Sequence, residues 1–396
     1  MLIFDAHLDL GMNALMWNRD LTRTIAEIRE QEEAMEGKGR ACNTVSLEEM
    51  RRGRVAMALA TVLARTGSSP APNLPMYRTA EIAYGMAQGQ LAHYRILERS
   101  GHLRMIRDST ELDEHWRTWA STQMATAKLA NATAPAGATA PADAIDPADG
   151  RGTPPPGVIL TMEGADSITS PDEVSLWWDD GLRAIGMTHY QDNQYAHGTG
   201  TEGGLKPPAE ALLEAMRSSG MILDLTHLAD QAFWEALDVW DGPVLASHNN
   251  CRSLVPGQRQ FSDDQIRAII ERGGVIGCAL DAWMLHPGWI KRVTKPEVVG
   301  LDAVADHMAH ICELAGNAHH VGIGSDLDGG FGTEQTPRDL DTIADLQKIA
   351  GALQERGFGE SDVARMMHGN WIDYFGRHLP DRRHATIGSN RGETNA

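Results

Sequence analysis

The sequence predicts an α/β fold of the (β/α)8 barrel type. Short apolar segments alternate with longer segments of helical periodicity along the chain. Residues that can perform chemistry follow those apolar segments, as in barrels whose sites lie at the carboxyl ends of the strands. Eight strand candidates suit such a barrel, which has about 250 residues plus insertions. Repeated strand–helix units also imply a parallel sheet with right-handed crossovers.

Eight apolar segments have the length and composition of buried strands. In chain order they are residues 2–4, 55–63, 157–162, 182–188, 221–225, 244–246, 274–279 and 321–324. Strands of a parallel sheet covered by helices are mostly apolar, as these are. We expect them to form the barrel wall.

Amphipathic segments with a period of 3.6 residues fill the intervals between the strands. The clearest is 80–98. Further helices are expected near 209–218, 230–239, 263–272, 302–314 and 338–355. Ser262, followed by two aspartates, is a good N-cap for the helix that begins at 263.

The chain is expected to form one catalytic domain over residues 1–377, followed by a polar tail at 378–396. The stretch at about 125–157 is rich in Ala, Thr, Pro and Gly, which predicts a flexible surface insertion. A lid over the site is the functional alternative for this insertion.

The charge excludes several classes of protein. Lys and Arg number 35 and Asp and Glu 54, a formal net charge of −19. This balance argues against nucleic acid and anionic membranes as partners.

The sequence has no apolar run long enough to span a bilayer and no basic signal sequence at its start, so we expect a cytoplasmic protein. The four widely spaced cysteines suggest neither a disulfide framework nor a thiolate zinc site.

Metal-binding residue types follow the first and third expected strands. His7 and Asp9 have an i, i+2 spacing that places both side chains on one side of the strand. They could bind one metal ion together; otherwise Asp9 is a helix cap beside a chance histidine. Glu163 directly follows 157–162, either as a ligand that can bridge two ions or as a substitute helix N-cap.

Histidines follow three more expected strands. His189 follows 182–188, and His227 and His248 follow the next two strands, 21 residues apart. One strand–helix unit spans that distance, which places these two on neighbouring strands. Neutral imidazole suits zinc, whereas a single buried histidine would indicate only packing.

Other candidates lie in the later loops. Asp326 can be a ligand, a proton carrier or an N-cap, and Asp328 is the more structural of the two. An arginine at the mouth of a metal site could grip a carboxylate in bidentate fashion, which makes Arg252 and Arg259 candidates. The candidate pocket residues, with plain packing as the alternative, are Asp281, Trp283 and Met284. The late histidines expected at the surface are His307, His310, His319 and His320.

Taken in order, these residues resemble the renal (membrane) dipeptidases, a zinc metallopeptidase branch of the amidohydrolase-like barrels. The matching motifs are His7-x-Asp9, Glu163 after an apolar strand, Thr188-His189, Asp224-Leu225-Thr226-His227, Ser247-His248-Asn249, residues 322–329 and Gly369-Asn370-Trp371. The resemblance runs from about Met1 to Phe375. No single motif decides it, whereas the first six, in order and each at a strand end, are together highly specific.

The resemblance implies a dipeptidase with two zinc ions. His7 and Asp9 would bind one ion, His227 and His248 the other, and Glu163 would bridge them. A metal-bridging hydroxide would attack the peptide carbonyl of a dipeptide substrate. The resemblance also implies a homodimer.

The resemblance assigns the remaining roles as well. His189 would polarise the substrate carbonyl and stabilise the oxyanion. Asp326 would carry the proton from the water to the leaving amine. Arg259, eleven residues after His248, would hold the terminal carboxylate of the substrate, with Arg252 as the nearby competitor.

The sequence departs from the family pattern in three places. Asp5-Ala6 stands where a glycine commonly precedes the histidine, and the Ala/Pro-rich insertion has no counterpart. The signal peptide and lipid anchor of the animal enzymes also have no match here, so membrane attachment should not carry over.

Other functions compete with the dipeptidase hypothesis. A related amidohydrolase could act on another amide, such as an N-acyl amino acid or a lactam, or on a lactone. A catalytically inactive barrel would lack a metal ligand, and all five proposed ligands are present. A Rossmann-type dehydrogenase is disfavoured because no GxGxxG follows an early strand.

Overall fold

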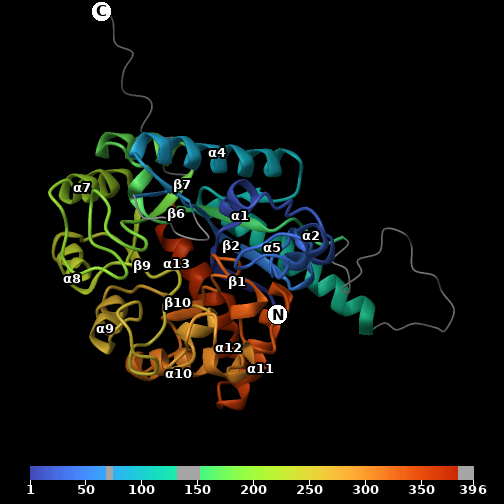
Figure 1. Cartoon of the computed structure of the whole chain (residues 1–396). Coiled ribbons are helices and arrows are strands. Elements are labelled where there is room, and N and C mark those ends of the chain that lie inside the picture. The colour runs from blue at the N-terminus through green and yellow to red at the C-terminus, as the bar shows by residue number, and fades with distance from the viewer. Residues whose placement is uncertain (68–74, 132–151, 382–396) are drawn as a thin grey trace, which may run out of the picture.

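The wall of the barrel is a ring of eight parallel strands (Figure 1). The computed structural model describes residues 1–67, 75–131 and 152–381. Around the ring the order is β10-β11-β1-β2-β6-β7-β8-β9. Ala246, directly after β9, pairs in parallel with Ile276 of β10, so the ring is nearly closed. The expected (β/α)8 barrel is confirmed.

The strands that form the ring are short. They are β1 (Ile3–Leu8), β2 (Val55–Val62), β6 (Gly157–Met162), β7 (Leu182–Gly186), β8 (Ile222–Asp224), β9 (Val244–Leu245), β10 (Ile276–Cys278) and β11 (Val321–Ile323). The longest register joins β2 and β6, from Met57 opposite Gly157 to Val62 opposite Met162. Beside the ring, β5 (Arg104–Met105) pairs with β6, and β3 (Arg65–Thr66) pairs with β4 (Met76–Tyr77).

Helices surround the strands in Figure 1. They are α1 (Leu10–Met16), α2 (Ile25–Glu32), α3 (Leu47–Arg52), α4 (Ala80–Arg99), α5 (Ser109–Asn131), α6 (Val174–Asp179), α7 (Ala209–Ser219), α8 (Asp230–Val239), α9 (Asp263–Glu271), α10 (Asp302–Ala315), α11 (Lys348–Glu355), α12 (Glu360–Ala364) and α13 (Asn370–His378). Ser262 caps α9 through a reciprocal pair of hydrogen bonds with Gln265, as its sequence predicts.

Two expected elements differ from the structure by more than two residues at one end. β1 runs to Leu8 instead of ending at residue 4, because the Asp5 carboxylate accepts hydrogen bonds from the backbone and hydroxyl of Ser325 and can therefore stay buried in the wall. The helix expected from 338 begins only at Lys348. Residues before it form a 3-10 turn, Ile343–Gln347, that Thr342 caps.

The expected insertion at about 125–157 lies mostly outside the described residues. Helix α5 continues through Asn131 into its first part, which is therefore helical. The tail after residue 381 also lies outside the described residues. In the described part of the chain, no helix has both the length and the apolar character that crossing a bilayer requires.

The C-terminal helix α13 is seen within the outline of the ring in Figure 1, and its aromatic side chains pack against the inward-facing side chains of the strands. Phe4 of β1 stacks on Trp371 and Phe375 of α13, with ring centroids 6.1 and 5.6 Å apart. Trp371 donates a hydrogen bond to the Ile323 carbonyl oxygen at 3.1 Å. These aromatic side chains fill the interior beneath the carboxyl ends of β1 and β11.

Two glycines allow the last strands to approach one another closely. A Cβ on Gly277 of β10 or on Gly324 after β11 would collide with the Ser247 carbonyl oxygen. The Asn249 N–H donates to the Gly277 carbonyl oxygen at 2.6 Å across the same junction. This glycine seam (Gly277 and Gly324) brings His248, the residue after Ser247, close to β1.

Candidate metal centre

Glu163, directly after β6, lies at the centre of a buried cluster of histidines. Its Oε1 atom lies 3.2 Å from His227 Nε2, 3.3 Å from His248 Nε2 and 3.6 Å from both His7 Nε2 and His189 Nε2. All five side chains are less than a tenth exposed. Since they come from β1 and from the ends of β6, β7, β8 and β9, the expected convergence at the carboxyl ends of the strands is confirmed.

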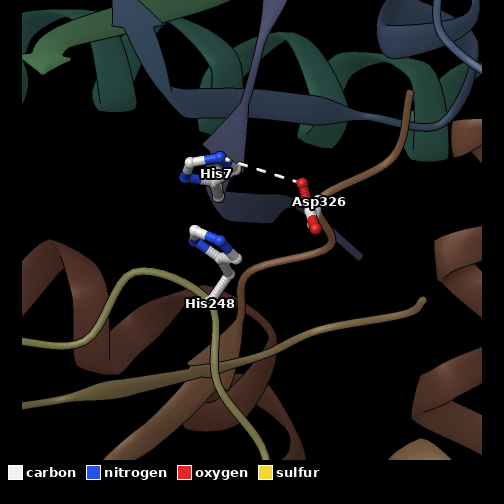
Figure 2. Close-up of side chains that lie close together, drawn as sticks. All are labelled: His7, His248 and Asp326. Atoms are coloured by element: carbon white, nitrogen blue, oxygen red, sulfur yellow. Dashed lines mark ion pairs between the residues drawn. The ribbon is translucent and has the colours of Figure 1, made fainter. Parts of the chain in front are cut away.

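Two carboxylates complete the cluster on the side of His7. His7 Nε2 lies 3.8 Å from Asp9 Oδ1 and 3.8 Å from Asp326 Oδ1. Figure 2 shows Asp326 to the right of the His7 ring and His248 below it, each from a different part of the chain. The His7 and His248 rings are in contact, with centroids 3.7 Å apart.

Hydroxyl groups hold the outer sides of the ligand candidates. Thr199 Oγ1 lies 2.9 Å from His227 Nδ1, and Ser247 Oγ lies 2.9 Å from His248 Nδ1. The Thr61 hydroxyl donates to Asp9 Oδ1. Partners at Nδ1 orient an imidazole so that Nε2 faces the metal position, which is the usual arrangement around bound metals.

The chemistry of the cluster fits divalent cations. Among the described residues, His7 Nε2 and Glu163 Oε2 are buried without a hydrogen-bond partner, which is costly unless another group binds them. Two sets of donor atoms overlap at Glu163. The first set is His7, Asp9 and Glu163, and the second is Glu163, His227 and His248. A third set consists of His7, His248 and Asp326. Imidazole nitrogens with carboxylate oxygens are the ligands that zinc accepts.

Burial sets the protonation of the site. It lowers the pKa of His227 and His248 well below the usual histidine value, which favours the neutral rings that a metal ion requires, and it does the same for His189. At His7 burial also acts to lower the pKa, but the Glu163 and Asp9 carboxylates outweigh it and raise the pKa. Burial also raises the pKa of Asp326 well above that of an ordinary carboxyl group, and Glu163 and Asp9 add to this. The raised pKa makes the Asp326 carboxylate a stronger base than an ordinary one, which suits a proton carrier.

The cluster forms the floor of a cavity of about 390 Å³. Arg259 lines it and donates a hydrogen bond from Nη2 to the His248 carbonyl oxygen at 2.8 Å. Its Nη1 atom has no hydrogen-bond partner within the described residues. Arg252, in contrast, is paired with Asp230 at 2.6 and 2.8 Å and does not line the cavity.

The remaining candidates from the sequence differ in where their side chains lie. The residues Asp281, Trp283 and Met284 line the cavity, as predicted. Asp328 accepts hydrogen bonds from Thr44 and Val45 and is structural. The surface prediction for His307 is wrong: its side chain is buried and its Nδ1 accepts a hydrogen bond from the Cys251 N–H at 3.0 Å.

Several cavity residues were not found from the sequence. Arg65 lies with Nη1 3.2 Å from His189 Nδ1, and it comes two residues after the expected strand 55–63, so the strand-end rule could have found it. Tyr190 follows His189 directly. Lys38 and Lys291 line the cavity from long loops, where no periodicity marks a residue as functional.

The fold and the cluster define a metal-dependent hydrolase of the (β/α)8 barrel class. The chain belongs to the membrane dipeptidase family, peptidase family M19, whose model matches residues 1–377. The family resemblance that the strand-end motifs predict is thereby confirmed.

Individual relatives agree with this assignment. The chain is 28% identical over 211 residues to an uncharacterized dipeptidase of Schizosaccharomyces pombe, which covers 52% of this chain and 49% of that protein. It is 29% identical over 214 residues to the dipeptidase verJ of Clonostachys rogersoniana, and this match covers 53% of this chain and 52% of that protein. The matches therefore span about half the length of these curated relatives.

Solved structures share the fold over nearly the whole chain. One is a dipeptidase of family M19 described as dipeptidase AC, with a TM-score of 0.72, 22% identity and coverage of 96% of this chain and 99% of that one. Another is a metallopeptidase from Rhodobacter sphaeroides liganded with a phosphinate mimic of L-Ala-D-Ala, with a TM-score of 0.71, 22% identity and the same coverage.

Proposed function

We propose that this chain is a binuclear zinc dipeptidase. The observation that carries the proposal is the shared Glu163 carboxylate. One of its oxygens faces four histidine Nε2 atoms within 3.6 Å, and the other is buried without a partner. A carboxylate so placed could bridge two cations. His7 and Asp9 would hold one ion, and His227 and His248 the other.

When bound, the ions would polarise the peptide carbonyl and lower the pKa of a water molecule so that it can attack at neutral pH. The residues of the chain supply the other parts of the reaction. His189 faces Glu163 from the wall of the cavity and, as a positioned donor, would stabilise the negative charge that develops on the carbonyl oxygen. Asp326, in its carboxylate form, would take up the proton of the water and pass it to the leaving nitrogen, and burial raises its pKa, which makes that carboxylate a stronger base than usual.

Arg259 would orient the substrate. Its free Nη1 atom lies on a guanidinium group that is anchored through Nη2 to the His248 backbone, so it can bind a terminal carboxylate at a fixed distance from the metal ligands. One such contact explains a limit to very short peptides. The Rhodobacter sphaeroides relative binds a mimic of L-Ala-D-Ala, which supports a dipeptide as the substrate here.

A related amidohydrolase activity is the second candidate. The same cluster could act on an N-acyl amino acid or a lactam, because these also have an amide carbonyl beside a carboxylate that Arg259 could bind. The loops of the cavity would decide between the substrates. A homodimer and a cytoplasmic location complete the proposal, and both rest on the sequence and the family alone.

The test is metal content per chain on purified protein, together with hydrolysis of L-L and L-D dipeptides. Two equivalents of zinc, with turnover that a chelator removes and zinc restores, would support the proposal. Two equivalents without dipeptide turnover would favour the second candidate. A protein that binds no metal when zinc is supplied would contradict the ligand assignment.

A further inference from the structure

Two lysine side chains line the cavity without a part in the proposed reaction. Lys38 lies in the loop between α2 and α3, and Lys291 lies in the loop after β10. The Lys38 ammonium nitrogen lies 5.7 Å from the centroid of the Phe331 ring, and that of Lys291 lies 5.1 Å from the Trp283 ring. Within the described residues, neither ammonium group forms an ion pair with a carboxylate.

The acidic groups near these lysines are engaged elsewhere. Asp281 Oδ1 accepts hydrogen bonds from Gln335 Nε2 at 2.7 Å and from the Trp283 N–H at 3.4 Å. Glu334, near Lys38, accepts from the N–H groups of Gly39 and Gly332 at 3.1 and 3.0 Å. Both carboxylates are thus held by the protein, and neither contacts an ammonium group.

The charges of these four groups balance, but their contacts differ. Hydrogen bonds from the protein hold the Asp281 and Glu334 carboxylates, whereas the Lys38 and Lys291 ammonium groups lie against aromatic rings and have no carboxylate within ion-pair distance among the described residues. Burial lowers the pKa of Lys38, as expected of an ammonium group that no carboxylate contacts. A substrate carboxylate would be the missing partner for the lysines.

The lysines and Arg259 belong to different parts of the cavity. The Arg259 guanidinium is held against the His248 backbone beside the metal-binding cluster, whereas Lys38 lies over the Phe331 ring and Lys291 over the Trp283 ring. A terminal carboxylate on Arg259 would therefore leave the lysines free for another group. The volume of about 390 Å³ lies in the usual range for a small-molecule site.

We propose that Lys38 and Lys291 form an anion subsite that selects substrates with a second carboxylate. Such substrates are dipeptides with an aspartate or glutamate residue, whose side chain would reach the lysines. This inference rests on the proposed dipeptidase function, which it deepens. A competing possibility is that Asp281 recognises a cationic side chain, and the same experiment decides between the two.

The experiment compares kcat/KM for Ala-Ala with that for dipeptides containing one Glu or one Lys at either position, each with an L or a D second residue. In Lys38→Met and in Lys291→Met, the ratio of acidic to neutral turnover should fall about tenfold, the effect of losing one charge-assisted hydrogen bond. Asp281→Asn should raise that ratio. Lys295→Met is the matched control, because Lys295 is exposed on the same loop and does not line the cavity.

An unchanged ratio of acidic to neutral turnover in both lysine variants would overturn the subsite. It would also be overturned if kcat/KM for the Lys-containing dipeptides fell in Asp281→Asn while the lysine variants showed no change. A binding measurement needs no turnover and keeps the two proposals distinguishable. Glutarate should raise the Tm of the zinc-supplied protein more than butyrate does, and that difference should disappear in the lysine variants. If no dipeptide is hydrolysed but this difference is seen, the dipeptidase proposal fails and the anion subsite stands.

Discussion

The Nε2 atoms of His227 and His248 lie 3.1 Å apart, although the two rings follow different strands. The hydroxyl oxygens of Thr199 and Ser247 can accept a hydrogen bond from the Nδ1 of each ring. With Nδ1 protonated, both Nε2 lone pairs point at the Glu163 carboxylate, and three electron-rich atoms then meet in a buried space. A cation among them would remove the repulsion, so the arrangement suits a bound metal ion.

Replacement of one of these histidines should release metal. We expect His248→Ala to hold less zinc per chain and to lose activity, because one ion loses a ligand. Ser247→Ala should weaken metal affinity by about 10- to 100-fold, as changes to the groups that orient ligands do. Metal analysis after dialysis measures both effects. His310→Ala is the control, and an unchanged zinc content in His248→Ala would contradict the ligand role.

The two aspartates after β11 should behave differently. Asp326→Asn should keep its metal while turnover falls by about 10²- to 10⁴-fold, the usual contribution of a general acid–base group. Asp328→Asn should instead lower Tm, because Asp328 accepts hydrogen bonds from Thr44 and Val45. Metal content, Tm and kcat should be measured on both variants. Near-full activity in Asp326→Asn would move the proton-carrier role elsewhere.

The two arginines offer a matched comparison for carboxylate binding. Arg259→Met should mainly raise KM for dipeptides with a free terminal carboxylate, by about tenfold or more for a lost charged hydrogen bond. Arg252→Met should change KM little, since Arg252 is paired with Asp230 outside the cavity. Steady-state kinetics on Ala-Ala and on its C-terminal amide would separate the roles. A KM that rises only in Arg252→Met would reverse the assignment.

The buried histidine His307 should make folding sensitive to acid. Burial lowers its pKa to about 4, whereas the unfolded chain titrates near 6.5. The unfolded state therefore binds more protons between these values, so stability falls as pH decreases through that window. For this one group, the loss between pH 7 and pH 5 is about 2 kcal/mol.

The substitution His307→Asn tests this directly, because an asparagine oxygen can still accept from the Cys251 N–H. The variant should lose less stability than the wild type between pH 7 and pH 5 in denaturant titrations. The exposed His319, changed to Asn, is the control. Equal pH dependence in His307→Asn and the wild type would show that His307 does not titrate as its burial requires.

The strand-end rule predicted the cluster because parallel strands bring their carboxyl ends to one face of the barrel. It needs only local patterns, so His7, Glu163, His189 and His227 could be found without contacts. His307 was misplaced although its signal was present: it falls three residues after Val304 and four before Ile311, on the buried face of α10. The cavity lysines lacked such a signal, because loops of irregular backbone place them.

The glycine seam has a consequence for how this enzyme can diversify. Any side chain at Gly277 or Gly324 would push against the backbone that carries His248, so these positions should be almost immutable. Lys38 and Lys291 lie in loops away from this seam. Substrate preference can thus change through substitutions at the rim of the cavity while the metal-binding residues stay in place. In a laboratory selection for activity on new substrates, the selected substitutions should fall in the loops that carry Lys38 and Lys291.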